Sequence, residues 1–133
     1  MFPVHEFWKP FDRLQRADSL RTVAFYNMKC PLHNGPEDYF ESPSRFYDVY
    51  VGHADLADSN PYFFASHASS RLASEKEVLL AHTSKYLRQF FELVRKASLT
   101  ESPFPVDEDT YVTADTFAAA RAATGTVLHG LFS

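Results

Sequence analysis

Cys30 and six histidines are the side chains of this sequence with the greatest capacity for chemistry. A catalytic cysteine needs a lowered pKa, and Lys29 beside Cys30 is a cationic neighbour of the kind that lowers it. No recognisable nucleophile motif surrounds Cys30, and a lone cysteine of this kind is more often inert. The sequence also lacks a Gly-x-Ser-x-Gly elbow, and its four glycines cannot form a phosphate-binding loop. We therefore expect no catalytic residues, no cofactor and no enzyme.

Cys30 and His33 also have the Cys-x₂-His spacing of a pair of zinc ligands. The string Cys30-Pro31-Leu32-His33-Asn34 resembles the first half of the zinc ribbon of bacterial primases, in which a Cys-x₂-Cys pair follows. That second pair has no counterpart here, because Cys30 is the only cysteine. Metal binding would then need ligands from elsewhere in the chain, and we expect no metal site. The residues considered as such further ligands are His53, His67, Asp48 and Asp55.

A further candidate is a histidine and carboxylate cluster, made of His53 with Asp55 and Asp58, together with His67 and His82. The helical spacing predicts that His67 and His82 face each other across a helical hairpin. Such a pair would suit a general base or a switch that responds to pH near neutrality. The competing interpretation is a pair of neutral imidazoles hydrogen-bonded inside a helix interface, and we favour it.

The charge and the apolar pattern exclude two classes of partner. The chain has 133 residues, with 13 Lys and Arg against 17 Asp and Glu, which gives a net charge of −4. This sign is wrong for neutralising nucleic-acid phosphates, so we expect no direct nucleic-acid binding. The sequence shows neither a long uncharged apolar run nor a signal peptide, which predicts no membrane partner and a cytoplasmic protein. Its length predicts one domain, residues 1–133.

The aromatic content is the feature that points most directly to function. Thirteen Phe, seven Tyr and one Trp make 16% of the chain, and neighbouring rings in a helix cannot all share one face. Rings left outside the core suit a protein interface, and the acidic residues between them suit a basic partner. The expected partner-binding residues are Glu37, Asp38, Tyr39, Phe40, Tyr47, Asp48, Tyr50, Asp55 and Tyr62.

These observations predict a non-enzymatic adaptor or inhibitor that covers a basic site on another protein, including one that itself binds nucleic acid. The alternative is a self-associating structural or assembly subunit, for example of a phage or virus particle. That homo-oligomer would use the same rings together with the apolar tail from Val127 to Phe132.

The elements that would position these residues read as an all-α bundle of about five helices. A short helix is predicted from Pro10, and a second from Asp18 or Ser19 to Asn27, although Thr22–Tyr26 would also suit a strand. Prolines indicate a long loop over residues 30–44. Helices are then predicted from Phe46 to Ala57 and from Pro61 to Leu72.

A capping box at Ser74 and Glu77 predicts the start of a long central helix over residues 75–97. We expect the other helices to pack around it. Residues 100–109 contain Pro103 and Pro105 and predict an extended connector. A last helix begins near Thr113 or Asp115 and is expected to close at Gly125 in the left-handed conformation.

Overall fold

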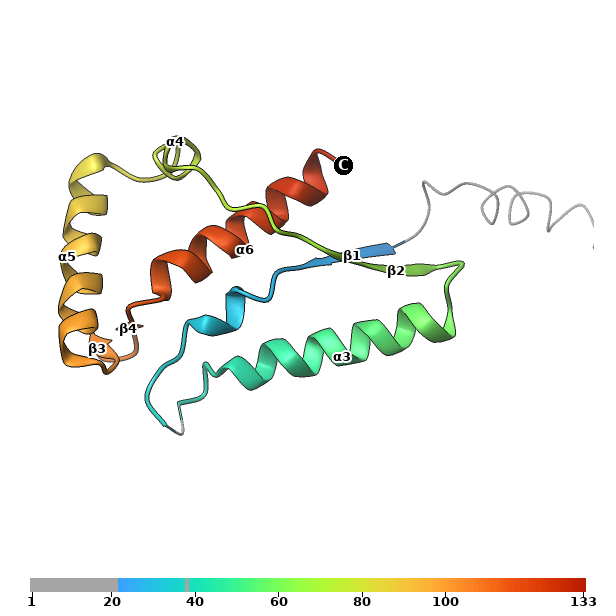
Figure 1. Ribbon diagram of the computed structural model, residues 1–133, viewed down its shortest axis with the longest axis horizontal. Coiled ribbons are helices and arrows are strands. Elements are labelled where there is room, and N and C mark those ends of the chain that lie inside the picture. The colour runs from blue at the N-terminus through green and yellow to red at the C-terminus, as the bar shows by residue number, and fades with distance from the viewer. Residues whose placement is uncertain (1–21, 38) are drawn as a thin grey trace, which may run out of the picture.

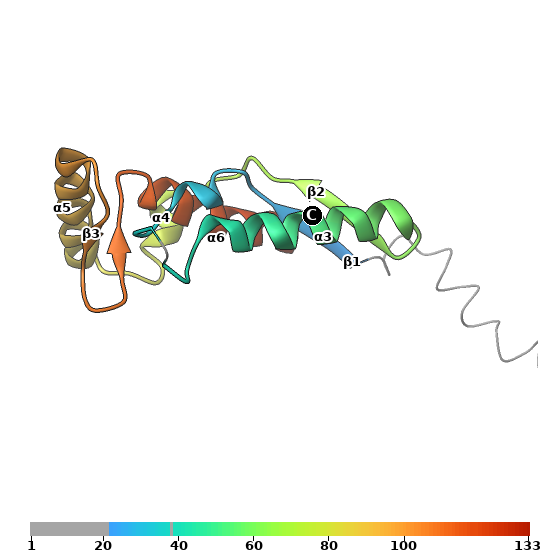
Figure 2. The ribbon, with the colours of Figure 1, turned by 90° about the horizontal axis from the view of Figure 1, so that it is seen from below.

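The chain combines four α-helices with two small two-stranded sheets in the part that the structure describes, residues 22–37 and 39–133. The computed structural model is elongated, with α5 and one sheet at one end and α3 and the other sheet at the opposite end (Figures 1 and 2). The elements in chain order are β1 (Thr22–Tyr26), the 3₁₀ turn η2 (Cys30–Leu32), α3 (Pro43–Ser59), β2 (Phe64–Ala68), α4 (Glu75–Val78), α5 (Ser84–Thr100), β3 (Phe104–Pro105), β4 (Tyr111–Val112) and α6 (Thr116–Leu131).

A β-α-β unit forms one end of the molecule. Strands β1 and β2 pair in parallel, with Thr22 opposite Phe64 and Tyr26 opposite Ala68. Parallel neighbours need a crossover connection, and helix α3 supplies it. The pairing is closed at its two ends by the bonds Thr22 N–H to the Phe63 carbonyl and Ser69 N–H to the Tyr26 carbonyl.

The two faces of this sheet are covered by different helices, because successive side chains of a strand point to opposite sides. On one face the Tyr26 ring meets Tyr50 of α3, with the ring centroids 4.7 Å apart. On the other face the Phe25 ring meets His129 of α6 at 5.1 Å. The short parallel sheet therefore lies between α3 and α6.

Helix α5 and the β3–β4 hairpin form the other end of the molecule (Figure 2). Strands β3 and β4 are antiparallel, and both pack against α5. Aromatic rings join α5 to the beginning of α6, where Phe91 contacts Phe117 edge to face at 4.7 Å. The two ends of the molecule thus share α6, which also touches η2 and β1.

The segment between β2 and α4 crosses α6 at close range. Gly125 is buried in the middle of α6, and a Cβ atom at this position would lie 2.7 Å from the carbonyl carbon of Arg71. Ala73, which is fully buried, donates its N–H to the Arg121 carbonyl, and the Arg121 Nε donates back to the Ala73 carbonyl. A glycine at 125 is what allows the two backbones to approach this closely.

The core of the described residues is small and built mainly from alanine. The buried apolar residues are Ala73, Leu87, Ala97, Val112, Ala119 and Ala122. None of the large side chains described is fully buried, and many large apolar ones are exposed. Ring surface is therefore left on the outside of the chain.

The prediction of an all-α, five-helix bundle was wrong. Thr22–Tyr26 forms β1 rather than part of a helix, and the stretch predicted as a helix from Pro61 to Leu72 contains β2. Short runs of aromatic and β-branched residues fit helical spacing and strand pairing alike. Pairing between β1 and β2 decides their structure, and that contact joins segments far apart in the sequence.

The prediction of one central helix over residues 75–97 was also wrong, although its capping box is confirmed. The Ser74 hydroxyl accepts the Glu77 N–H at 3.2 Å, and a Glu77 carboxylate oxygen accepts the Ser74 N–H at 2.7 Å. Helix α4 nevertheless ends at Val78. Thr83 provides a second N-cap, since its hydroxyl accepts the Tyr86 N–H at 3.1 Å, and α5 begins after it. The apolar stripe is therefore divided between two helices.

Four further predictions concern the remaining elements. The helix expected from Phe46 to Ala57 is confirmed as part of α3, and residues 100–109, expected as an extended connector, contain β3 and the turn that leads to β4. Gly125 is not a left-handed C-cap, because α6 continues to Leu131 and no described glycine has a positive φ. The helix predicted from Pro10 falls outside the described residues.

Among residues 22–37 and 39–133, none of the helices has both the length and the apolar character needed to cross a bilayer.

Candidate partner-binding surface

Helix α3 is the element on which most of the predicted partner-binding residues depend. Ser42 has the extended backbone of an N-cap, and Pro43 follows with the fixed φ that suits a first turn. The helix ends where the Asn60 N–H bonds to the Leu56 carbonyl. None of its 17 residues is buried, so the helix is held by one half-buried face and leaves the rest open.

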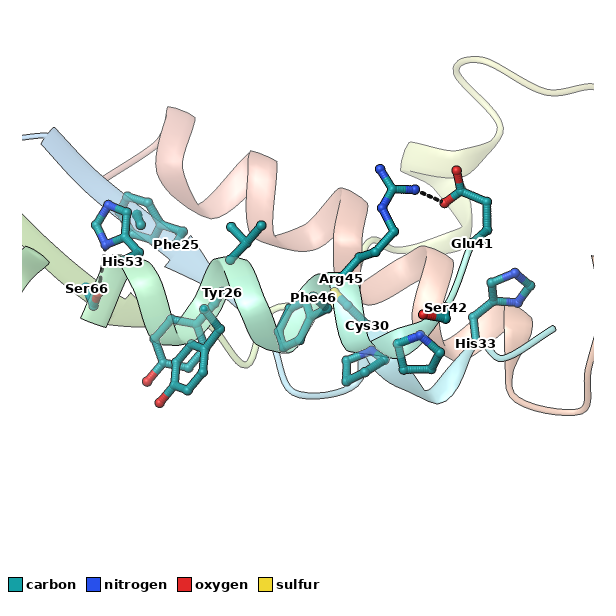
Figure 3. A pocket seen from close by; sticks show the side chains of 15 residues that line it. Phe25, Tyr26, Cys30, His33, Glu41, Ser42, Arg45, Phe46, His53 and Ser66 are labelled. Atoms are coloured by element: carbon teal, nitrogen blue, oxygen red, sulfur yellow. Dashed lines mark hydrogen bonds and ion pairs between the residues drawn. The ribbon is translucent and has the colours of Figure 1, made fainter. Parts of the chain in front are cut away.

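The inner face of α3 is aromatic and contacts the parallel sheet. The ring of Tyr50 lies against Tyr26, and it is parallel to the ring of Phe46 within 4° at 6.3 Å. One turn on, His53 Nδ1 lies 3.1 Å from the Ser66 hydroxyl of β2 (Figure 3). Tyr50 therefore points toward the sheet and away from the solvent-facing side of the helix.

The outer face of α3 is exposed and mainly acidic. It consists of Tyr47, Asp48, Val51, Asp55 and Asp58, all of which are exposed. Their spacing of one, four, eight and eleven residues places them on the side away from the sheet. Tyr47 is 45% exposed, although it belongs to a ring-rich stretch of the helix.

This outer face has an excess of negative charge. The cation of the helix, Arg45, pairs with Glu41 at 2.5 Å (Figure 3). Asp48, Asp55 and Asp58 form no ion pair with any described residue. Three carboxylates beside an exposed tyrosine therefore remain available to a basic partner.

The predicted binding residues in the loop before α3 differ in exposure. The Tyr39 hydroxyl donates to the Asp109 carbonyl, and its ring meets Tyr111 edge to face at 5.2 Å. Burial, followed by the charge of Asp109, raises the pKa of Tyr39. Phe40 beside it is 68% exposed, and Glu37 is exposed as well. Tyr39 thus fastens the loop to the β3–β4 hairpin while Phe40 stays outside.

The turn after α3 adds a second exposed pair of rings. Tyr62 is 72% exposed and Phe63 is 55% exposed. Of the nine predicted residues, the structure brings Tyr47, Asp48 and Asp55 onto one helix face and leaves Phe40 and Tyr62 near the two ends of that helix. Tyr50 faces the sheet, and Asp38 lies outside the described residues.

The expected pairing of His67 with His82 was wrong. His67 lies on β2, where its ring meets Phe25 and His129, each at 5.4 Å between centroids. His82 instead stacks on Tyr86 at 5.0 Å. The helical hairpin assumed for the pair does not exist, because one of its two helices is a strand.

His129 is the histidine that sequence reasoning missed. Its Nδ1 lies 2.9 Å from the hydroxyl of Ser69, which is buried at the end of β2. The available signal was its position one turn after Gly125, on the side of α6 that crosses the rest of the chain. Sequence alone did not show that this side faces β1 and β2.

Cys30 and His33 lie on and just after η2, where they contact different parts of the structure. Burial raises the pKa of the Cys30 thiol, whereas a catalytic cysteine needs a lowered pKa. His33 Nδ1 lies 2.8 Å from the Thr116 hydroxyl and ties η2 to the start of α6. Within residues 22–37 and 39–133, no three His, Cys, Asp or Glu side chains are grouped so that they could hold a metal ion.

Comparison with known proteins adds no relative to this description. No protein-family model matches the chain, and a search of curated proteins gives no match. The function is therefore argued from the surface of α3 and its surroundings.

Proposed function

We propose that this protein is a non-enzymatic binding module that docks the outer face of α3 onto a basic site of another protein. The observation that supports this proposal is the exposure of α3. The helix buries none of its residues, and its outer face exposes Tyr47 beside Asp48, Asp55 and Asp58. Exposed rings provide contact area at a low entropic cost, and tyrosine is enriched among the residues that dominate interfaces.

The charge of the face favours a basic partner over a second copy of the chain. A symmetric dimer places the same patch of both copies in contact. Asp48, Asp55 and Asp58 would then face the same acidic patch on the second copy. Like charges at an interface cost several kcal/mol. A basic partner replaces this repulsion with attraction, and it also gains association rate through long-range steering.

The proposal is tested with two double charge reversals, one on the outer face of α3 and a control away from it. The wild-type chain, Asp48→Lys with Asp55→Lys, and Glu92→Lys with Glu108→Lys are each immobilised and exposed to an extract of the organism that supplies the gene. Both variants change the formal charge equally, and all four residues are exposed. Bound proteins are eluted with salt and identified by mass spectrometry.

We expect the wild-type chain and the Glu92/Glu108 variant to retain the same basic protein, and the α3 variant to lose it. Elution with moderate salt is expected, because attraction between exposed charges is screened beyond about 10 Å at 0.1 M ionic strength. Equal retention by all three chains, or retention that follows net charge alone, would contradict the proposal.

A further inference from the structure

A cleft lies on the side of α3 opposite to the proposed docking face. It has a volume of about 650 Å³ and is bounded by β1, η2 and α3 (Figure 3). Pockets for small molecules typically have volumes of roughly 300–1,000 Å³. His53 and His33 lie at its two ends in Figure 3, with Cys30 between them.

The cleft is lined by the small side chain of Ala24 and by several rings. Ala24 on β1 lies beside Tyr26 in its lining, and α3, whose Tyr50 ring meets Tyr26, packs mainly against β2 and η2. Phe46 and Tyr50 line the helix side. Val49, which also lines the cleft, is 73% exposed and therefore stands at its opening to solvent.

The geometry of the rings favours a flat occupant. The rings of Phe46 and Tyr50 are parallel within 4°, and that of Tyr26 is inclined to Tyr50 by 58°. Aromatic surfaces gain most from offset stacking and edge-to-face contact with another ring. Since all three rings line the cleft, a planar aromatic molecule in it would meet an aromatic wall.

The charge of the cleft favours an uncharged occupant. Its cation, Arg45, is already paired with Glu41. The Nδ1 atoms of His33 and His53 are each engaged by a neighbouring hydroxyl group. Burial raises the pKa of the Cys30 thiol, because the thiolate would lose hydration at this half-buried position. A charged ligand would lose hydration and gain no unpaired counter-ion from the described residues that line the cleft.

We propose that this cleft binds an uncharged, planar aromatic small molecule. This site is separate from the docking face of α3 and would remain if that face had no basic partner.

The first test compares two dyes that share one ring framework. N-phenyl-1-naphthylamine is uncharged, and 8-anilinonaphthalene-1-sulfonate carries an added sulfonate. We expect the uncharged dye to bind the whole protein saturably, at one site per chain and more tightly than the sulfonate, as measured by fluorescence titration. Tighter binding of the sulfonate, or binding without saturation, would overturn the proposal.

The second test uses a matched pair of substitutions in exposed valines. Val49→Asp places a carboxylate at the opening of the cleft, and Val127→Asp makes the same change on α6, where Val127 is 63% exposed and outside the cleft. We expect Val49→Asp to weaken binding of the uncharged dye about tenfold, since the added charge must lose water beside an apolar ligand. Val127→Asp should change it less than about twofold. Equal affinities in the two variants would place the dye elsewhere.

The third test needs no substitution, because Cys30 is the only cysteine in the chain and lines the cleft. Alkylation by iodoacetamide therefore reports on this wall alone. With the uncharged dye present at about ten times its Kd, the alkylation rate should fall about tenfold, in proportion to the unoccupied fraction. An unchanged rate would overturn the proposal even if a variant failed to fold.

Discussion

The rings of Tyr26 and Tyr50 meet at 4.7 Å between centroids, and this contact joins β1 to the inner face of α3. Tyr50 also lies parallel to Phe46, so it touches rings on both the strand and its own helix. Tyr47, less than one turn away, is exposed and meets Phe46 at its edge. Two tyrosines of the same helix therefore have different roles.

Tyr50→Ala should lower the free energy of unfolding by about 2 kcal/mol, because it removes half-buried ring contacts between β1 and α3. Tyr47→Ala should change it by less than about 0.5 kcal/mol, as exposed substitutions usually do. Urea unfolding followed by circular dichroism measures both values. Similar losses in the two variants would mean that the outer face of α3 is also packed.

Two glycines in helices offer a second matched comparison. Gly125→Ala would place a Cβ against the backbone of Arg71 and Ala73. Backbone atoms cannot move aside as the end of a flexible side chain can. We expect a loss of about 3 kcal/mol from this overpacking. At Gly52, an added Cβ would meet no described atom within 4 Å apart from its chain neighbours and the nearby backbone of α3. Gly52→Ala should therefore stabilise the protein by roughly 0.5–1 kcal/mol through helix propensity.

The thermal midpoint of each glycine variant gives the comparison directly, with the wild-type chain as reference. A stable Gly125→Ala protein would show that the crossing between residues 71–73 and α6 is looser than described.

Glu77 should give the stability of the protein a specific dependence on pH. The N–H and hydroxyl groups of Ser74, and then the charge of Arg71, lower the pKa of Glu77. Arg71 reaches the same carboxylate at 2.6 Å. A lowered pKa in the folded state means that the unfolded chain binds the proton more tightly. The stabilisation from Glu77 is thus present above its unfolded pKa and is lost as the pH falls through the folded one.

The variant Glu77→Gln keeps the shape of the side chain and removes this titration. Denaturant unfolding at a series of pH values between about 6 and 3 should show the two proteins converging as the pH falls. A constant difference over that range would show that charge on Glu77 has no part in the cap.

Local signals in the sequence predicted those elements whose start and period are set by neighbouring residues. The recurrence of Phe46, Tyr50 and His53 every three or four residues indicated α3, and Ser74 with Glu77 indicated the start of α4. Thr83 is also a good capping residue, but it lies inside an apolar stretch long enough to read as one helix. Its bond to the Tyr86 N–H is what divides that stretch.

The parallel sheet could not be predicted in the same way. Thr22–Tyr26 has residues suited to both helix and strand, and its partner at Phe64–Ala68 lies beyond the whole of α3. The prediction of which α3 side chains face solvent depended on this pairing of β1 with β2. The choice between Tyr47 and Tyr50 as the outward ring follows from where the strands lie, and only the folded chain shows that position.

The order of β1, α3, β2 and α6 also bears on how the nascent chain emerges from the ribosome. Strand β1 is made first, but its partner β2 appears only after α3, and the helix that covers Phe25 appears last among these four. Phe25 can therefore be shielded from water by α6 only after α6 has been synthesised. One face of the parallel sheet gains its helix only after α6, the last element of the described chain, has been made.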